Sequence, residues 1–248
     1  MGPGLREGRY RSRIAETAED LRAAQALRHL CFRGGEGLDA DPFDDRCTHV
    51  LIEERAGGRL VCCYRLLPLS GGAEIGGSYS AQFYGLERLE RFEGPMAEMG
   101  RFCIHPEARD ADILRVAWGA MTSWVDARGV ELLFGCASFR GVEAEAYLDA
   151  FDMLAERHLA PRRWLPRVKM ADVVRFAERF RRLGRQTADR REGLRRMPPL
   201  LKTYLAMGGW VSDHAVVDRD MNTLHVFTGL EIAAVPPTRA RALRALAG

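Results

Sequence analysis

The stretch MAEMGRFCIHP, residues 96–106, constrains the fold of this chain more than any other. Its apolar residues and closing His-Pro pair predict a short buried strand over 97–104, because a proline cannot donate to a sheet. Glu98 and Arg101 place two charges inside that strand. Gly100 between them predicts an irregularity, where a backbone N–H leaves the ladder and becomes free to polarise a carbonyl. The alternative is a core strand whose two charges pair with each other or with solvent.

The overall composition is that of a globular protein with one main core. The chain has 248 residues, of which 47% are hydrophobic and 29% are charged. No apolar run approaches the ~20 residues that a membrane span needs. The first ten residues lack the apolar centre of a signal peptide, and the six cysteines show no metal-binding spacing. We therefore expect a cytoplasmic protein without a bound metal.

Positive charge is concentrated in one segment. Residues 157–202 hold fifteen Lys and Arg against four Asp and Glu, a charge of +11, whereas the remainder carries −8. A local positive field favours an anionic partner, which can be nucleic acid, an acidic protein or an anionic membrane surface. Within this segment, residues 170–183 have an apolar face and an arginine-rich face. They predict an amphipathic helix that either faces the core or lies on a membrane.

Hydrophobic periodicity and turn residues predict the other elements. We expect strands at 10–14, 49–53, 59–66, 132–136, 214–218 and 223–227, and helices at 17–31, 111–128 and 143–155, with a short helix from Pro198. Residues 184–197 look mobile, and the residues from Pro236 onward look like a tail. This order of elements predicts an α+β fold.

An acidic loop covers residues 34–46 and carries Asp39, Asp41, Asp44 and Asp45. Four carboxylates in seven residues form either a solvated turn or a site for a divalent cation or a cationic substrate. The spacing lacks the glycine and the distal glutamate of an EF-hand loop, so the solvated turn is the preferred interpretation.

Seven motifs, in this order, resemble the ornithine Nα-acyltransferases of bacterial ornithine-lipid synthesis over nearly the whole chain. They are Arg28 with Phe32, DPFD at 41–44, YRLL around Arg65, EMGRFCIHP from Glu98, LLFGCASF from Leu132, PPLLKTYLAMGG from Pro198 and VVDRDMNT from Val216. The part from Arg28 to Arg101 is shared with the acyl-homoserine-lactone synthases. Those enzymes usually have a tryptophan in the loop at 34–46, which this chain lacks, and the last two motifs look specific to the ornithine branch.

The resemblance implies a GNAT-like fold, with a mixed, largely antiparallel central sheet flanked by helices. It implies one domain over 1–248, with a main core at 8–160, a basic helical insertion at 161–199, and a closing helix and strands at 200–235. The implied reaction moves a 3-hydroxyacyl group from acyl carrier protein to the α-amine of L-ornithine, which gives lyso-ornithine lipid. The acyl-phosphopantetheine of the carrier protein is then the donor substrate, and no cofactor is expected.

Two other classes of function remain open. An acyl-homoserine-lactone-type synthase, or another amino-acid N-acyltransferase, is the alternative enzyme. A basic module that binds nucleic acid or a membrane is the alternative without catalysis, although no helix-turn-helix, RRM or zinc pattern accompanies the charge, so we expect no nucleic-acid partner.

Acyl transfer from a thioester to an amine needs a base, a polarised carbonyl and an acid for the leaving thiolate. Glu98 is the candidate base, directly or through a water, if burial makes it basic enough. Arg101 is the second catalytic candidate. A backbone N–H between Phe102 and Ile104 is the donor to the thioester oxygen that the fold resemblance implies. Tyr147 is the candidate acid, although a tyrosine on an amphipathic helix more often packs in the core.

The resemblance also assigns a set of substrate-binding positions. These are Arg28, Phe32, Asp41, Asp44, Arg65, Phe102 and Cys103. Cys103 and His105 share one face of their strand, which would suit a Cys–His nucleophile. GNAT-type transfer is direct, however, so a packed thiol is the preferred interpretation of Cys103.

The identity of the donor is inferred from the start of the helix at 111–128. Enzymes of this fold that use CoA bind its pyrophosphate with a glycine-containing loop and a helix N-terminus. Here the loop PEARDADIL has no glycine and places Asp110 and Asp112 at that end, where they oppose an anion. We therefore expect acyl carrier protein as donor, with Arg175, Arg179 and Arg182 docking its acidic surface, either in the cytoplasm or at the inner face of the membrane.

Overall fold

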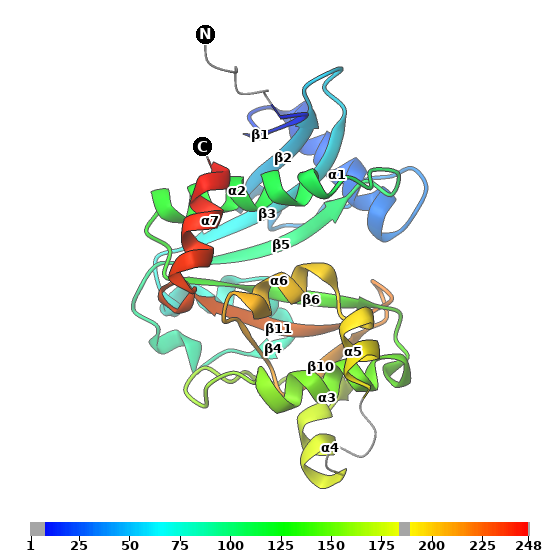
Figure 1. Ribbon diagram of the computed structural model, residues 1–248, viewed down its shortest axis with the longest axis vertical. Coiled ribbons are helices and arrows are strands. Elements are labelled where there is room, and N and C mark those ends of the chain that lie inside the picture. The colour runs from blue at the N-terminus through cyan, green and yellow to red at the C-terminus, as the bar shows by residue number, and fades with distance from the viewer. Residues whose placement is uncertain (1–7, 184–188, 248) are drawn as a thin grey trace. The chain divides into compact units, whose positions relative to one another are not determined.

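The computed structural model describes residues 8–183 and 189–247 (Figure 1). The chain divides into two compact units, and strand β5 (Met96–Ile104) passes from the second to the first between Met99 and Gly100. The first unit contains the residues up to Leu67, Gly100–Arg128 and the residues from Ala240, and the second contains Pro68–Met99 and Gly129–Arg239. The sequence-based boundaries at 160, 199 and 235 are not tested by this division and stay a prediction.

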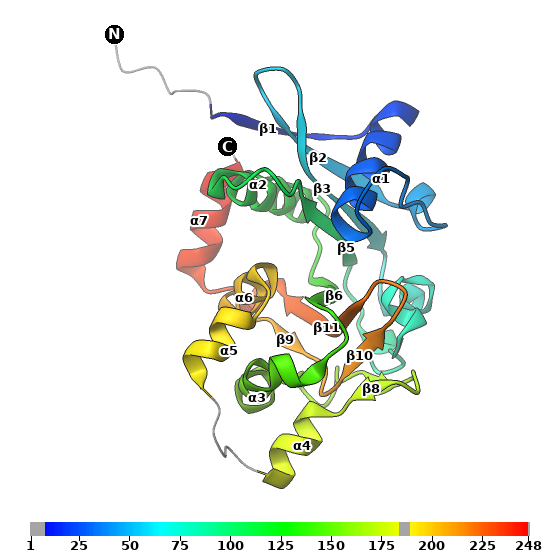
Figure 2. The ribbon, with the colours of Figure 1, turned by 90° about the vertical axis from the view of Figure 1, so that its right-hand side faces the viewer.

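The first unit is a sheet with one helix on each face (Figure 2). Its strands are β1 (Tyr10–Ile14), β2 (Thr48–Glu54), β3 (Leu60–Leu69) and the C-terminal half of β5, and its helices are α1 (Ala18–Phe32) and α2 (Ala111–Ala127). β1 pairs antiparallel with β2, and β2 pairs antiparallel with β3 as the predicted hairpin. Cys63 packs against α1, whereas the next residue, Tyr64, donates to the Ala117 carbonyl of α2. Successive residues of β3 therefore face opposite helices.

Local signals explain why the helices of the first unit begin and end where they do. The Thr17 hydroxyl accepts from the Asp20 amide, and the Asp20 carboxylate accepts from the Thr17 amide. This capping box satisfies two amides that a helix start leaves without partners. Gly129 follows α2 in a left-handed conformation, with φ of +59°, as expected for a helix end.

The second unit contains a sheet in the order β5, β6, β11, β10, β8, with β9 also paired to β11. The strands are β6 (Leu132–Arg140), β8 (Val173–Val174), β9 (Trp210–Val211), β10 (Ala215–Asp218) and β11 (Thr223–Glu231). The first half of β5 pairs parallel with β6, up to Met99 opposite Gly135, while the other pairings are antiparallel. β4 (Tyr84–Gly85) and β7 (Arg167–Val168) form a separate small sheet.

One face of this second sheet is covered by helices, and α3 lies beside α4 and α5 (Figure 1). They are α3 (Leu148–Arg157), α4 (Phe176–Leu183), α5 (Arg190–Arg196) and α6 (Pro199–Ala206). Phe139 of β6, Phe151 of α3 and Phe176 of α4 meet in its hydrophobic core, with stacked or tilted rings about 5.1 Å apart. The last helix is α7 (Pro237–Ala247). Within the first unit, its Arg244 forms an ion pair of 2.7 Å with Asp126 of α2.

Three sequence predictions need correction. Residues 170–183 do not form one amphipathic helix, because Val173 and Val174 form β8 and pair with β10, so that only α4 is helical. The two β-branched residues favour a strand once a partner edge is present. Residues 184–188 lie outside the described residues, but the remainder of the expected mobile segment contains α5. The expected tail contains α7.

The predicted α+β class with a mixed, largely antiparallel sheet is confirmed. Among the helices in the described ranges, none combines the length and the apolar character needed to cross a membrane.

Candidate functional site

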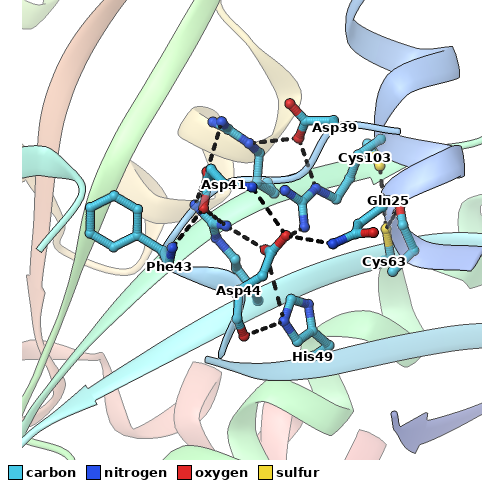
Figure 3. A network of polar contacts seen from close by, with 12 residues as sticks. Gln25, Asp39, Asp41, Phe43, Asp44, His49, Cys63 and Cys103 are labelled. Carbon is cyan, nitrogen blue, oxygen red and sulfur yellow. Dashed lines mark hydrogen bonds and ion pairs between the residues drawn. The ribbon is translucent and has the colours of Figure 1, made fainter. Parts of the chain in front are cut away.

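Three arginines and three aspartates of the first unit form a closed ring of ion pairs around the acidic loop (Figure 3). The arginines come from α1, β3 and β5, and all three aspartates come from the loop. The ring runs from Arg28 to Asp39 (2.8 Å), Arg101 (2.9 Å), Asp41 (3.1 Å), Arg65 (2.6 Å), Asp44 (2.6 Å) and back to Arg28 (2.7 Å). Each member contacts two of the opposite charge, so the six formal charges cancel.

The ring is buried at Arg28, Asp39, Asp44 and Arg65 and partly exposed at Arg101 and Asp41, whose side chains are 13% and 17% exposed. The side chain of Arg28 is 1% exposed, and those of Asp44 and Arg65 are each 4% exposed. Burial by itself would raise the pKa of Asp44, but hydrogen bonds from Arg28, Gln25 and Arg65 lower it to about 2. Asp44 is therefore ionised at neutral pH, and its charge is held by its partners.

This arrangement replaces both interpretations of the acidic loop. Asp39, Asp41 and Asp44 are neither solvated nor grouped around a cation site, because guanidinium groups occupy their oxygens. Removing one partner from a buried ion pair leaves an uncompensated charge, which costs about 3–5 kcal/mol. The ring thus fixes the loop onto the sheet.

The irregularity expected at Gly100 lies one residue later. Arg101 has φ of +55°, a left-handed conformation that costs a non-glycine residue roughly 1–2 kcal/mol. This backbone turn presents the guanidinium to Asp39 and Asp41. Gly100 itself lies against Arg65, since a Cβ there would sit 3.6 Å from its Nε.

The ring collects five of the residues singled out from the sequence, namely Arg28, Asp41, Asp44, Arg65 and Arg101. Sequence reasoning noticed Asp39 in the loop but gave it no role, although it bridges Arg28 and Arg101. The substrate-binding and catalytic roles assigned to these residues stay predictions.

The other predicted substrate-binding residues pack nearby in the first unit. Phe32 lies against the core between α1 and the sheet, and Phe102 stacks on Tyr64 with ring centroids 5.5 Å apart. The Cys103 sulfur lies 3.5 Å from that of Cys63. A hydrogen bond with Cys31 lowers the pKa of the Cys103 thiol. The hydrogen bond with Cys63 and the burial of the thiol both raise this pKa, and together they outweigh Cys31, so the pKa of Cys103 lies above its usual value. A protonated thiol of this kind is a poor nucleophile.

Glu98 of β5 is the predicted catalytic carboxylate, and its hydrogen-bond partners come from the turn before β4. Its Oε2 accepts from the Tyr79 amide at 2.8 Å, and its Oε1 accepts from the Ser80 amide at 2.7 Å and the Ser80 hydroxyl at 2.5 Å. The residue is 5% exposed. Ser80 Oγ also lies 3.4 Å from the Cys136 sulfur on β6. Sequence reasoning missed Tyr79, Ser80 and Cys136 as members of this cluster.

Tyr147, the predicted leaving-group acid, uses its hydroxyl for another contact. The hydroxyl donates to the Arg140 carbonyl at 2.6 Å, and the ring packs edge-on against Phe139 with centroids 5.0 Å apart. It lies in a 3-10 turn that precedes α3 rather than in the predicted helix. These contacts favour the packing role that was the alternative at the sequence level.

The three arginines proposed to dock a carrier protein are not equivalent. Arg179 of α4 forms an ion pair of 2.6 Å with Asp152 of α3. Arg175, just before α4, and Arg182, near its end, are exposed. Neither has an ion pair with any part of the chain that the structure describes. Their charges are available to a partner, whereas that of Arg179 is partly neutralised.

Comparison with known proteins identifies the family. The chain is 36% identical to the L-ornithine N(alpha)-acyltransferase of Rhodobacter capsulatus over 242 residues, which cover 91% of both chains. The chain belongs to the L-ornithine N(alpha)-acyltransferase family. It is also 30% identical to the enzyme of that name from Rhizobium meliloti, over 90% of this chain and 80% of the relative.

Two further comparisons describe the fold of this family member. A family model described as an acetyltransferase (GNAT) domain matches residues 27–119, which contain the whole ion-pair ring and Glu98. A solved N-acyl amino acid synthase from uncultured soil microbes has a TM-score of 0.50 and 10% identity, covering 91% of this chain and 93% of that one. The predicted GNAT-like fold is confirmed.

Proposed function

We propose that the protein transfers a 3-hydroxyacyl group from acyl carrier protein to the α-amine of L-ornithine, giving lyso-ornithine lipid. The observation that carries this proposal is the 36% identity, over 91% of the chain, with a relative named L-ornithine N(alpha)-acyltransferase. The GNAT-like fold suits direct attack of an amine on a thioester. In that step the C–N bond forms, the C–S bond breaks, and the amine loses a proton to a base.

Glu98 is the base in this proposal. Three N–H and O–H donors from Tyr79 and Ser80 fix its carboxylate in one orientation. A base held in this way loses little orientational freedom when it takes the proton of the ornithine ammonium, directly or through a water. The geometry therefore supports a positioned carboxylate, and the exchange of Glu98 for Gln described in the Discussion tests its role.

The start of α2 supports a donor without a pyrophosphate. Asp110 caps this helix by accepting from the Asp112 amide at 3.0 Å, and it also accepts from the Tyr10 hydroxyl at 3.1 Å. The hydrogen bond from the Asp112 amide lowers the pKa of Asp110, and the hydrogen bond from the Tyr10 hydroxyl lowers it further. A carboxylate of the protein thus occupies the helix end at which a phosphate would otherwise bind. Phosphopantetheine on a carrier protein needs no such site for a diphosphate.

The exposed arginines Arg175 and Arg182 support an acidic carrier protein as the partner. Charges at the rim of an interface act mainly on the rate of encounter and are weakened by salt, with a screening length of ~8 Å at physiological ionic strength. Arg179 has a different role in this proposal, because its bond to Asp152 joins α4 to α3 and so holds the surface in shape.

The proposed reaction is tested with purified protein, L-ornithine and either 3-hydroxyacyl carrier protein or the matching acyl-CoA. We expect mass spectrometry to detect Nα-acylornithine, with the higher kcat/KM for the carrier-protein donor. L-lysine and S-adenosylmethionine serve as control acceptors. Absence of acylornithine would contradict the activity, while equal or better use of CoA would contradict only the choice of donor.

The docking surface is tested by the double variant Arg175→Glu, Arg182→Glu. We expect a higher KM for the carrier protein and an unchanged KM for ornithine, which is also the effect of added salt on the wild type. Arg115→Glu, on α2 of the first unit, is the matched charge reversal and should leave both values unchanged. Normal kinetics combined with lost binding to anionic vesicles would assign the arginines to a membrane surface instead.

A further inference from the structure

A chain of three side chains links Glu98 to the surface of β6 in the second unit. Ser80 Oγ lies 2.5 Å from Glu98 Oε1 and 3.4 Å from the Cys136 sulfur. Ser80 is completely buried, whereas Cys136 is partly exposed. Of the two residues that follow Glu98 in this chain, Cys136 is therefore the one that is open to a substrate.

The direction of these hydrogen bonds follows from the number of protons on the Ser80 hydroxyl and the Glu98 carboxylate. A serine hydroxyl has one proton, and an ionised carboxylate can only accept. Ser80 donates its proton to Glu98, so its oxygen is left to accept from the Cys136 thiol. With Glu98 ionised, the proton of Cys136 points at Ser80.

Protonation of Glu98 reverses this chain. A protonated carboxyl group becomes a donor, so Glu98 then donates to the Ser80 oxygen, and the Ser80 proton turns toward the sulfur of Cys136. The sulfur now accepts from Ser80, so its own S–H no longer points at the Ser80 oxygen. The state of Glu98 thus decides whether the proton of Cys136 is directed at Ser80 or away from it.

We propose that Cys136 is the acid that protonates the leaving thiolate, and that proton uptake by Glu98 enables this step. Ornithine reacts as the neutral amine, after the proton of its ammonium group has passed through Glu98 to solvent, and its nitrogen gives a second proton to Glu98 as it attacks the thioester carbon. When the C–S bond breaks, the electron pair stays on the pantetheine sulfur, which takes the proton of Cys136. Ser80 then passes its proton to Cys136 and recovers one from Glu98, which restores the starting state.

The chemistry of the leaving group suits a cysteine. A thiol has an ordinary pKa of about 8.5, which is close to that of another thiol, so transfer between the two is nearly isoenergetic. Position supports the same role, since Cys136 directly follows Gly135, at which the pairing of β5 with β6 ends. A Cβ at Gly135 would lie 2.3 Å from the Met99 carbonyl oxygen, so glycine is required to keep β6 close to Glu98. Tyr147, the earlier candidate, has its hydroxyl bound to Arg140.

This inference rests on the proposed function, and it is tested with two donors that share one acyl group. One is the alkyl thioester of the carrier protein, and the other is an aryl thioester, whose thiolate leaves without protonation. We expect Cys136→Ala to lower kcat about 10²-fold with the alkyl thioester, within the range typical of a lost general acid. With the aryl thioester we expect Cys136→Ala to react at nearly the wild-type rate, whereas Glu98→Gln should be slow with both.

Ser80→Ala provides the second variant, because Ser80 acts only through its neighbours. Like Cys136→Ala, this variant should be slow with the alkyl thioester and nearly normal with the aryl thioester. It should also move the acid limb of the pH–rate profile to higher pH, because Glu98 loses a hydrogen-bond donor that stabilises its ionised form. Cys136→Ser, which keeps a donor of higher pKa, should fall between Cys136→Ala and the wild type. Thermal melting verifies that each variant is folded.

Several outcomes would overturn the inference. Cys136→Ala could equal the wild type with the alkyl thioester, or it could be equally slow with both donors. An acyl adduct on Cys136, trapped without ornithine and seen by mass spectrometry, would make this residue a nucleophile instead. A wild type that makes no acylornithine from either donor would overturn the proposed function together with the inference, whereas the other results affect the inference alone.

Discussion

The two units stabilise their buried carboxylates with different partners. Around Asp44 in the first unit, the partners are guanidinium groups that belong to a closed ring of opposite charges. Around Glu98 in the second unit, two backbone amides and a serine hydroxyl donate to the carboxylate. Losing a charge from a buried ring costs about 3–5 kcal/mol, whereas losing one hydrogen bond to a charged group costs about 1.5–3 kcal/mol. The ring therefore holds the loop on the sheet by charge, whereas the donors to Glu98 fix the orientation of one carboxylate.

The largest expected effect breaks the ring. Arg28→Met keeps much of the volume of the side chain but leaves Asp39 and Asp44 with one guanidinium fewer. We expect the free energy of unfolding to fall by about 3–5 kcal/mol, measured by urea denaturation. Arg115→Met is the control, because its pair with Asp112 is half exposed and contributes less than about 1 kcal/mol. A ring variant as stable as this control would contradict the structural role.

The pH dependence of stability distinguishes the two units. Burial lowers the pKa of His225 to about 4, with a smaller contribution from His214. The unfolded chain takes up a proton near pH 6.5 and the folded chain only near 4, so stability falls as the pH drops through this window. We expect His225 to account for a loss of about 3 kcal/mol between pH 7 and 4. Asp44 titrates lower, and its contribution is present above about pH 4 and lost toward 2.

His225→Asn isolates this effect from the other histidines, because Asn can replace the contact of the ring nitrogen Nδ1 with the Tyr84 hydroxyl. Urea denaturation at pH 7 and pH 4 should show a smaller difference for the variant than for the wild type. An unchanged difference would mean that His225 is not neutral in the folded protein over this range.

The next effect is catalytic and concerns the Glu98 cluster. Glu98→Gln keeps the shape of the side chain but cannot take a proton, so we expect kcat to fall by about 10²-fold or more. The loss of stability should be smaller than that of Arg28→Met, although the single oxygen of Gln can accept from the Ser80 amide or from the Tyr79 amide but not from both. Steady-state kinetics and thermal melting measure the two effects. Wild-type rates across the pH range would contradict the assignment of the base.

The smallest effect concerns Tyr147. Tyr147→Phe removes the hydroxyl that binds the Arg140 carbonyl, and we expect a loss of about 1 kcal/mol in stability. The rate should change little, because the hydroxyl is used for packing. A large fall in kcat with the alkyl thioester, restored by the aryl thioester, would return the role of leaving-group acid to Tyr147.

The sequence by itself determined the elements whose signals are local. The capping residue Thr17 placed the start of α1, the Ala-Gly-Gly turn placed the β2–β3 hairpin, and the run ending in His-Pro placed β5. The ordered motifs also indicated the family, since they span nearly the whole chain. The predicted elements needed only residues that are close together in the sequence, and each family motif is itself a short run.

The tertiary structure alone decided the elements and contacts that depend on distant partners. Val173 and Val174 became a strand because β10 offered an edge, and α7 formed where Arg244 meets Asp126. The ring and the Ser80–Glu98 bond were decided in the same way, because the paths of two loops determine which oxygen meets which donor. The local sequence shows only that these residues are charged or polar. Which groups pair is decided by burial, because a polar group that loses its hydrogen bonds to water must find a partner within the protein.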